Sequence, residues 1–136
     1  MKPQTVELRG AIGVDEVVER VLETRLREVR SLTTGLRSRD PRSLHDFRIA
    51  CKRLRYALER FEALDPSLES AAERLAELQD ALGETHDCDV LLAILPPAMA
   101  ATERRLRIER EACLDRAVAL WDEVRALMEA VNSHRV

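Results

Sequence analysis

With 136 residues, the chain is long enough to build one domain with its own hydrophobic core. Charged residues make up 35% of it, aromatic residues only 3%, and there are four Gly, a composition that favours an all-helical protein packed by Leu, Val and Ala. The formal net charge of −3 excludes a polyanion binder that works by bulk charge, so any such function requires a local cluster of cations.

Two helices are predicted in the first half of the chain. Residues 1–13 lack helical periodicity and are interpreted as an N-terminal lead-in. Apolar residues at helical spacing then predict a first helix over about 14–38. Asp40 followed by Pro41 predicts the start of a second helix, because Asp caps free amides and Pro lacks the amide that would be unpaired there.

The second half of the chain predicts a third helix over about 68–82 and a last helix over about 97–132. Between them, residues 85–95 are expected to form either a short extra helix or a bent continuation of the third helix. The connections are short, so consecutive helices should pack antiparallel. The fold class is therefore all-α, an antiparallel four-helix bundle over residues 14–132 with a C-terminal tail at 133–136.

Positive charge is concentrated in the second helix. Residues 37–60 hold eight Arg or Lys and three acids, whereas residues 62–90 hold nine acids and a single Arg. Such segregation creates a local field that the net charge hides. At about 100° per residue, residues 44–61 divide into two faces. The face expected in the core holds Leu44, Phe47, Ala50, Cys51, Leu54, Ala57, Leu58 and Phe61. The opposite face holds His45, Arg48, Lys52, Arg53 and Arg55.

This opposite face is the main candidate for function. Four of its side chains repeat about once per turn: His45, Arg48, Lys52 and Arg55. They form a row about 15 Å long, which suits a repeating anion such as a chain of phosphates, and Arg matches phosphate oxygens well. The alternative is a solvated charged face, but such faces usually mix acids and bases at i, i+4 spacing. Considered alone, His45 is better explained by one local hydrogen bond near a helix start.

Three further arginines are possible additional anion contacts. Arg42 lies in the first turn of the second helix, and Arg104 and Arg107 lie in the last helix. The last two would extend the cationic surface if their helix packed beside the second one. Glu103 and Glu109 partly neutralise that cluster, so a solvated face explains it better.

Metal binding or redox sensing is an alternative from another class. It would use His45, His86 and the cysteines, and the run H-D-C-D at 86–89 does contain ligand types. Neighbouring helix positions point in different directions, however, so capping of a new helix by Thr85 or Asp87 explains the run better. The three cysteines are widely spaced, which indicates buried residues in a reducing compartment and predicts a cytoplasmic protein.

The sequence contains no motif that predicts catalysis or a cofactor: there is no P-loop, no G-x-G-x-x-G and no nucleophile with an identifiable base. It also shows no signal peptide and no apolar run of membrane length. Tyr56 is the only aromatic residue on the cationic face, which is thin for base stacking and disfavours nucleic acid as a partner.

Two stretches resemble the conserved histidine α-helical domain, or CHAD, family. They are L-H-D-F-R-I-A-C-K-R-L-R-Y-A-L-E-R-F at 44–61 and L-A-E-L-Q-D-A-L-G-E-T-H-D-C-D-V-L at 75–91. The first matches the family pattern at His45, Arg48, Lys52, Arg53, Leu54 and Arg55. The second matches it at Leu75, Leu78, Leu82, Gly83, Asp87, Asp89 and Val90. The order and spacing of both motifs make the resemblance specific, and it extends over about 14–131.

The resemblance implies a non-catalytic helical module that binds inorganic polyphosphate through five contacts: His45, Arg48, Lys52, Arg53 and Arg55. Two departures from the family pattern stand out. His86 replaces a frequent Arg, which weakens a phosphate role for its segment, and the chain holds one four-helix unit where family members usually hold two. Either two chains pair as a homodimer that rebuilds eight helices, or the chain is half of a longer protein. A ligand-free oligomerisation bundle remains a third interpretation.

Overall fold

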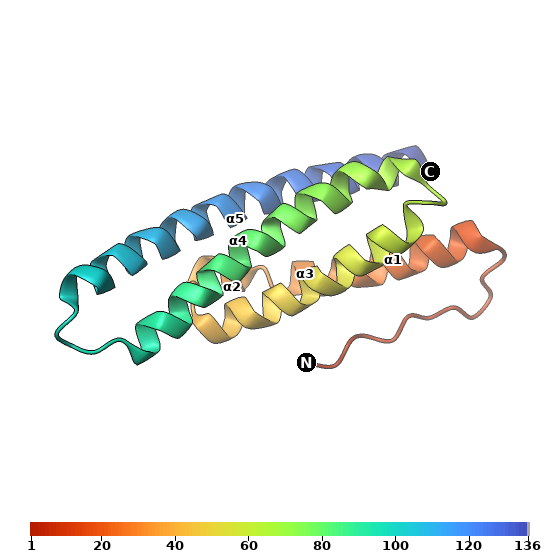
Figure 1. Ribbon diagram of the computed structural model, residues 1–136. Coiled ribbons are helices and arrows are strands. Elements are labelled where there is room, and N and C mark those ends of the chain that lie inside the picture. Colours follow the sequence, from red (N-terminus) through yellow and green to blue (C-terminus); the bar gives the residue numbers. More distant parts are fainter. Residues whose placement is uncertain (136) are drawn as a thin grey trace.

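The protein is an up-and-down bundle of four long helices, described by a computed structural model over residues 1–135, with side chains through residue 133. The helices are α1 (Val14–Ser31), α2 (Thr34–Ser38), α3 (Pro41–Phe61), the 3₁₀ turn η1 (Pro66–Leu68), α4 (Glu69–Ile94) and α5 (Ala100–Arg135). Successive long helices run in opposite directions (Figure 1). The predicted all-α four-helix architecture is confirmed.

The single first helix predicted over about 14–38 is divided in two, α1 and α2. At Leu32 and Thr33 the amides bond to carbonyls three residues back, at 3.0 and 3.4 Å, so the helix tightens and ends. The short α2 then crosses the start of α3. Gly35 lies so close to it that a β-carbon there would meet the carbonyl oxygen of Ser43 at 2.7 Å. Because Gly35 has no side chain, α2 can pack directly against the start of α3.

The start of α3 forms as predicted. The Asp40 side chain accepts a hydrogen bond from the Ser43 amide at 3.1 Å, and Pro41 occupies the first helical position. The inward face is buried in the core, with Phe47, Leu54 and Leu58 at 0% exposure. The Phe47 ring packs edge to face on Trp121 of α5, with centroids 5.9 Å apart. Packing of this face in the core therefore fixes which side of α3 points inward.

Of the two alternatives for residues 85–95, the structure has a continuation of the third helix and no separate short helix, because α4 runs as one helix through Gly83 to Ile94. Thr85 does not cap a new helix: its hydroxyl is buried and donates to the Ala81 carbonyl at 2.9 Å, one turn back. Cys88 is also buried, since α5 packs along this part of α4. Packing against α5 therefore outweighs the local turn signal, and the helix ends only before Pro96.

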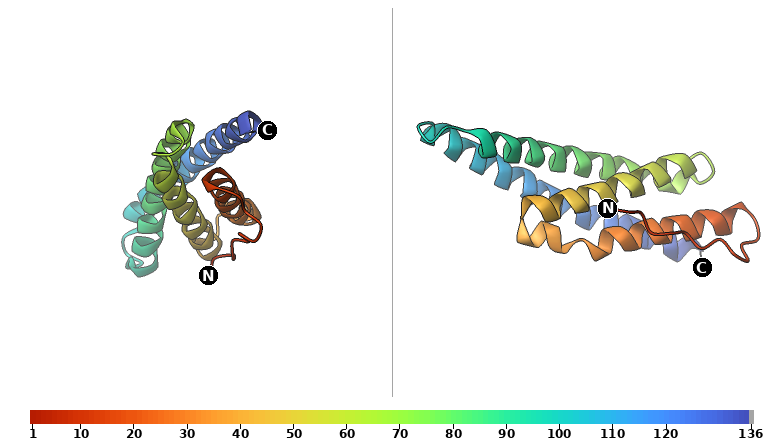
Figure 2. Two further views of the ribbon diagram at one scale, coloured as in Figure 1. Left: turned by 90° about the vertical axis from the view of Figure 1, so that its right-hand side faces the viewer. Right: turned by 90° about the horizontal axis from the view of Figure 1, so that it is seen from below.

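The α4–α5 hairpin extends beyond the rest of the bundle (Figures 1 and 2). Near its end the two helices and their connection carry exposed apolar side chains: Val90, Leu91, Ile94, Met99 and Ile108. No helix in the described part of the chain is long and apolar enough to cross a membrane.

The N-terminal segment has no helix, as predicted for residues 1–13, but it is hydrogen-bonded along α1. The Gln4 amide donates to the carboxylate of the buried Glu28 at 2.7 Å, and Arg25 pairs with the same carboxylate. Arg25 also donates to the Gln4 carbonyl at 3.1 Å. The segment thus supplies partners for a charge that burial would otherwise penalise.

Two glycine substitutions should change stability in opposite directions. Gly35→Ala places a methyl group against the Ser43 backbone, so we expect a loss of about 1–3 kcal/mol in the free energy of unfolding. Gly83→Ala meets no atom within 4 Å inside a helix, so we expect a gain of about 0.5–1 kcal/mol. Urea titration followed by circular dichroism measures both. A Gly35→Ala protein as stable as the parent would contradict the close approach of α2 to α3.

Candidate functional site

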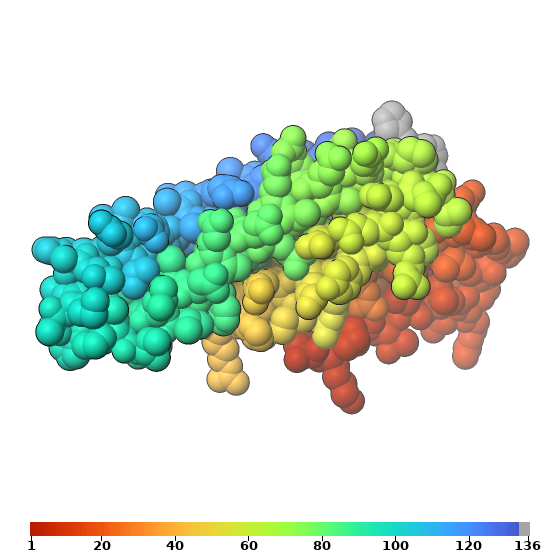
Figure 3. All heavy atoms as spheres, viewed as in Figure 1, coloured from red at the N-terminus to blue at the C-terminus, as the bar shows by residue number. Residues whose placement is uncertain are grey.

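The outward side of α3 carries the candidate site. His45 and Lys52 are exposed, and Arg48 and Arg55 are half-buried. At about 100° per residue, these four side chains lie within about 80° of the helix circumference. They run along the border between α3 and α4, which lie side by side on the face seen in Figure 3. The helix therefore presents the predicted row of four cationic or titratable side chains to solvent.

The row is held in place at Arg55. Its Nε donates to Glu59 at 2.8 Å, and its Nη1 donates to the Gln79 amide oxygen of α4 at 2.9 Å. Tyr56 lies between two cations of the row, since its ring centroid is 5.7 Å from Lys52 Nζ and 5.9 Å from Arg55 Cζ. Glu59 is exposed, which weakens its pairing with Arg55, so an anion of higher charge can compete for Arg55.

At the other end of the row, α4 adds a histidine. The His45 and His86 rings face each other across the two helices, with centroids 6.4 Å apart. They border a shallow depression of about 10 Å³, room for about one water molecule. The depression is lined by Pro41, Leu44, His45, Arg48, Leu82, Thr85, His86 and Asp89. Its size suits an anion that lies across the surface, not a ligand enclosed in a cavity.

The Asp89 carboxylate, which lines this depression, is already paired with an arginine of α5. Asp89 accepts a hydrogen bond from Arg110 of α5 at 2.5 Å, and both side chains are largely buried. Arg110 also donates to the Arg39 carbonyl at 2.5 Å, in the turn between α2 and α3. Arg39 itself pairs with Glu111 and Asp115, and its hydrogen bond to Asp115 is the main cause that raises its pKa. The Asp89 carboxylate is therefore paired with Arg110, which links α4, α5 and the turn before α3. In this pair, Asp89 does not repel an anion bound at the histidines.

Arg53 is separated from the row. It lies about 140–160° around the helix from Arg48 and Arg55, where its Nη2 donates to the Met1 carbonyl at 2.6 Å. Its Nη1 is buried without a hydrogen-bond partner in the described residues. The N-terminal segment thus covers this guanidinium, and the structure does not bring it together with the other four side chains.

Of the additional arginines, Arg104 and Arg107 lie apart from the row as well. Arg42 is exposed in the first turn of α3. Arg104 and Arg107 are exposed near the start of α5, in the hairpin that extends beyond the start of α3, and Arg107 is paired with Glu103 at 2.9 Å. The last helix therefore does not continue the α3 row with these two residues. The residue of this helix that reaches the depression is Arg110, which pairs with Asp89.

A family model for the CHAD domain matches residues 3–96, more than half of the chain. The chain belongs to the CHAD family. No curated protein and no solved structure matches it. CHAD domains are binding modules associated with polyphosphate, not a catalytic family. The match ends at Pro96, so α5 lies outside the matched range although it completes the bundle.

The two CHAD motifs meet at the α3–α4 border. The first motif supplies His45 and Arg48, and the second supplies His86 and Asp89, all four of which line the same depression. The two motifs, at 44–61 and 75–91 in the sequence, therefore contribute to one surface. The association of the second motif with this surface could be foreseen only from the antiparallel packing of the two helices.

The cysteines of this CHAD domain lie where their thiols stay protonated. Cys51 is fully buried, which raises its pKa. Burial, followed by the hydrogen bond to Glu84, raises the pKa of Cys113 to about 11. Burial is also the main cause that raises the pKa of Cys88. Among the described residues, no group of three or more His, Cys, Asp or Glu side chains is arranged to hold a metal ion.

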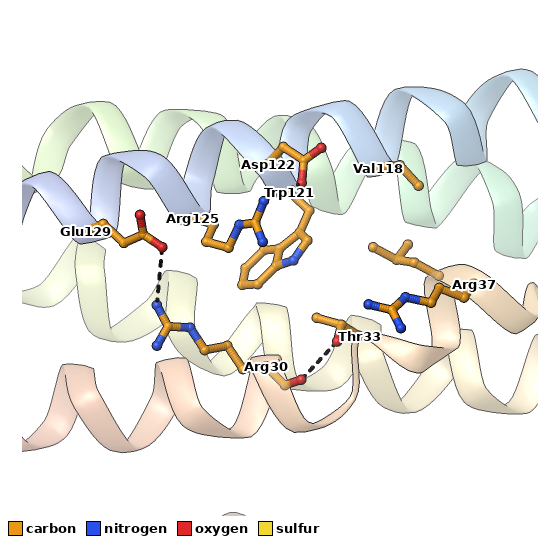
Figure 4. A pocket seen from close by; sticks show the side chains of 9 residues that line it. Arg30, Thr33, Arg37, Val118, Trp121, Asp122, Arg125 and Glu129 are labelled. Atoms are coloured by element: carbon orange, nitrogen blue, oxygen red, sulfur yellow. Dashed lines mark hydrogen bonds and ion pairs between the residues drawn. The ribbon is translucent and has the colours of Figure 1, made fainter.

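A larger groove lies elsewhere, between the α1–α2 junction and α5. It has a volume of about 460 Å³ and is lined in part by Arg30, Arg37, Trp121 and Arg125 (Figure 4). Its arginines alternate with acids: Arg30 lies 4.0 Å from Glu129, and Arg125 lies 3.1 Å from Asp122. These ion pairs within the groove make it a weaker candidate for a polyanion than the α3 row.

Cysteine alkylation tests whether the thiols are reactive. The thiolate is the nucleophile, so we expect iodoacetamide to label Cys113 slowly at pH 8 and about tenfold faster per pH unit until about pH 11. Cys51 should react only after unfolding in urea. Peptide mass spectrometry resolves the sites. Labelling of Cys113 at pH 8 as fast as that of free cysteine would favour the redox-sensing alternative.

Proposed function

We propose that this CHAD domain binds inorganic polyphosphate, without catalysis and without a cofactor, on the outward side of α3. The observation that carries the proposal is the row of His45, Arg48, Lys52 and Arg55 at the border with α4. Each member repeats at about one helical turn, so phosphates spaced along an extended chain can meet successive donors. Charge-assisted hydrogen bonds to phosphate are about twice as strong as neutral ones.

The other predicted contact residues contribute less to binding in this proposal. Arg53 reaches a polyanion only where the N-terminal segment gives up its bond to the guanidinium. Arg42 extends the row by one turn at its start. Arg104 and Arg107 contact only the parts of a long chain that continue past the end of the bundle. The binding energy is therefore assigned mainly to the four-residue row.

The alternatives have less support. A metal or redox role for His45, His86 and the cysteines lacks a cluster of ligands in the described residues and involves protonated thiols. A nucleic-acid partner lacks stacking partners, because Tyr56 is flanked by two cations and stands alone on this face. A ligand-free oligomerisation bundle differs from the proposal in predicting no thermal shift with polyphosphate. The cysteine usage supports a cytoplasmic location, which we propose on that ground alone.

Reversal of two charges in the row tests the site. We expect Arg48→Glu with Arg55→Glu to weaken binding of long-chain polyphosphate by at least about tenfold, because two attractive contacts become repulsive. Stability should change little, since both side chains lie outside the core and the Glu59 pair is exposed. Fluorescence titration and thermal unfolding measure the two effects. In low salt the parent should bind tightly, and log K should fall linearly with log salt concentration.

The matched control is Arg27→Glu with Arg116→Glu, which makes the same change in net charge. Both arginines are exposed, on α1 and α5, and their ion pairs with Glu23 and Glu84 are 3.7 and 3.9 Å long. This variant should bind within about threefold of the parent, because distant exposed charges are largely screened. Equal loss of binding in both variants, or in neither, would contradict the assignment of the site to α3.

We further propose that two chains form a homodimer in which eight helices assemble. The exposed apolar side chains of the hairpin support it, since Val90, Leu91, Ile94, Met99 and Ile108 are costly to leave in water. Light scattering at micromolar concentration should give twice the 15.5 kDa mass of one chain. Ile94→Glu with Ile108→Glu should give the monomer mass. A monomeric parent would overturn the dimer without affecting the polyphosphate proposal.

A further inference from the structure

The pair of histidines at the end of the row differs chemically from the arginines beside it. His45 comes from α3 and His86 from α4, and both side chains are exposed. Their ring centroids are 6.4 Å apart and the rings are inclined at 38°. Among the described residues, neither imidazole takes part in a hydrogen bond or an ion pair. Both rings therefore have nitrogens that are available to a ligand from solvent.

We propose that His45 and His86 form a proton-controlled subsite for one phosphate group of a polyphosphate chain, so that affinity rises as pH falls. The inference rests on the proposed function and adds its regulation, together with a contact from α4. One phosphate group can reach both rings, since an N–H···O bond spans about 2.9 Å and the rings face the same depression. Imidazoles change charge between about pH 5 and 8, whereas Arg and Lys do not.

The charged groups around the pair favour this behaviour. From α3, Arg48 lines the same depression and repels a protonated imidazole. From α4, Asp89 lines it too, but Arg110 of α5 already pairs with that carboxylate at 2.5 Å. Arg39, in the turn before α3, likewise forms ion pairs with Glu111 and Asp115. No free carboxylate in the depression is therefore left for the imidazoles, and a bound phosphate is the group that can balance their charge.

Proton binding and anion binding are then linked. At high pH each neutral ring still offers one N–H donor to the anionic phosphate, but the ring itself carries no charge. At low pH the ring is a cation, so the attraction between opposite charges adds to the hydrogen bond. Reciprocity requires that phosphate binding also favour protonation of the pair. The complex should consequently take up protons when it forms near pH 6.5, and up to two more counterions should be released at low pH than at high pH.

The experiment measures affinity for long-chain polyphosphate at pH 5.8 and pH 8.0, at one ionic strength, with circular dichroism to verify folding. Long chains are used because their internal phosphates keep the same charge over this range. We expect the parent to bind about 10–25-fold more tightly at the lower pH, about three- to fivefold for each histidine. Calorimetry at pH 6.5 in buffers of different ionisation enthalpy should show proton uptake on binding.

Three variants identify the source of the effect. His86→Arg should bind tightly at pH 8.0 and retain only the part of the pH dependence due to His45, because Arg keeps its charge. His45→Gln with His86→Gln should remove the pH dependence and the proton uptake. Both positions are exposed, so neither change disturbs the core. Arg27→His adds an exposed imidazole on α1 as a control and should leave the pH ratio of the parent unchanged.

Each outcome decides the inference. Loss of pH dependence in the double variant, with the parent ratio kept by Arg27→His, supports it. Binding by the parent that is equally tight at both pH values overturns the inference and leaves the polyphosphate proposal standing. Persistence of the full pH dependence in the double variant also overturns it. Absence of binding by the parent at both pH values overturns the proposed function, and the inference falls with it.

Discussion

Phe47, Leu54 and Leu58 of α3 are completely removed from water, and their burial sets the rotation of that helix about its axis. Burial of one such side chain stabilises a fold by about 1.5–3 kcal/mol, so no other rotation of α3 competes. Because helical side chains recur every 3.6 residues, the positions left outside are then determined. His45, Arg48, Lys52 and Arg55 are among them, and their exposure to solvent is a consequence of the core.

A protein with a net charge of −3 can keep a cationic surface because its charges are unevenly distributed, and several of its acids form ion pairs away from the α3 row. Glu111 and Asp115 pair with Arg39, Glu77 and Glu123 with Arg74, and Asp89 with Arg110. Most of these pairs are exposed and add little stability individually. The pair of Asp89 with Arg110 matters for the field, since it leaves no free carboxylate in the depression beside the row. Local pairing, and not the total charge, decides which anions approach this face.

The same arrangement explains why the binding surface belongs to two helices. Arg110 ties α4 to the turn before α3 through Asp89 and the Arg39 carbonyl. This network lies next to the depression that His86 shares with His45. The hairpin of α4 and α5 is thus fastened to the start of α3 at the point where the two CHAD motifs meet. A substitution in α5 can therefore alter the candidate site without touching a ligand.

The sequence by itself determined the features whose signals are local. Apolar periodicity predicted the four long helices and the inward face of α3, and Asp40 with Pro41 predicted its start. Only the tertiary structure decided the break before Gly35 and the continuity of α4 through Gly83, because contacts with α3 and α5 outweigh the local preferences there. It also decided the contacts of His45 with His86, of Asp89 with Arg110 and of Arg53 with Met1. Each joins residues more than 20 positions apart, and the rotation and register of one helix against another leave no periodic pattern in a single sequence.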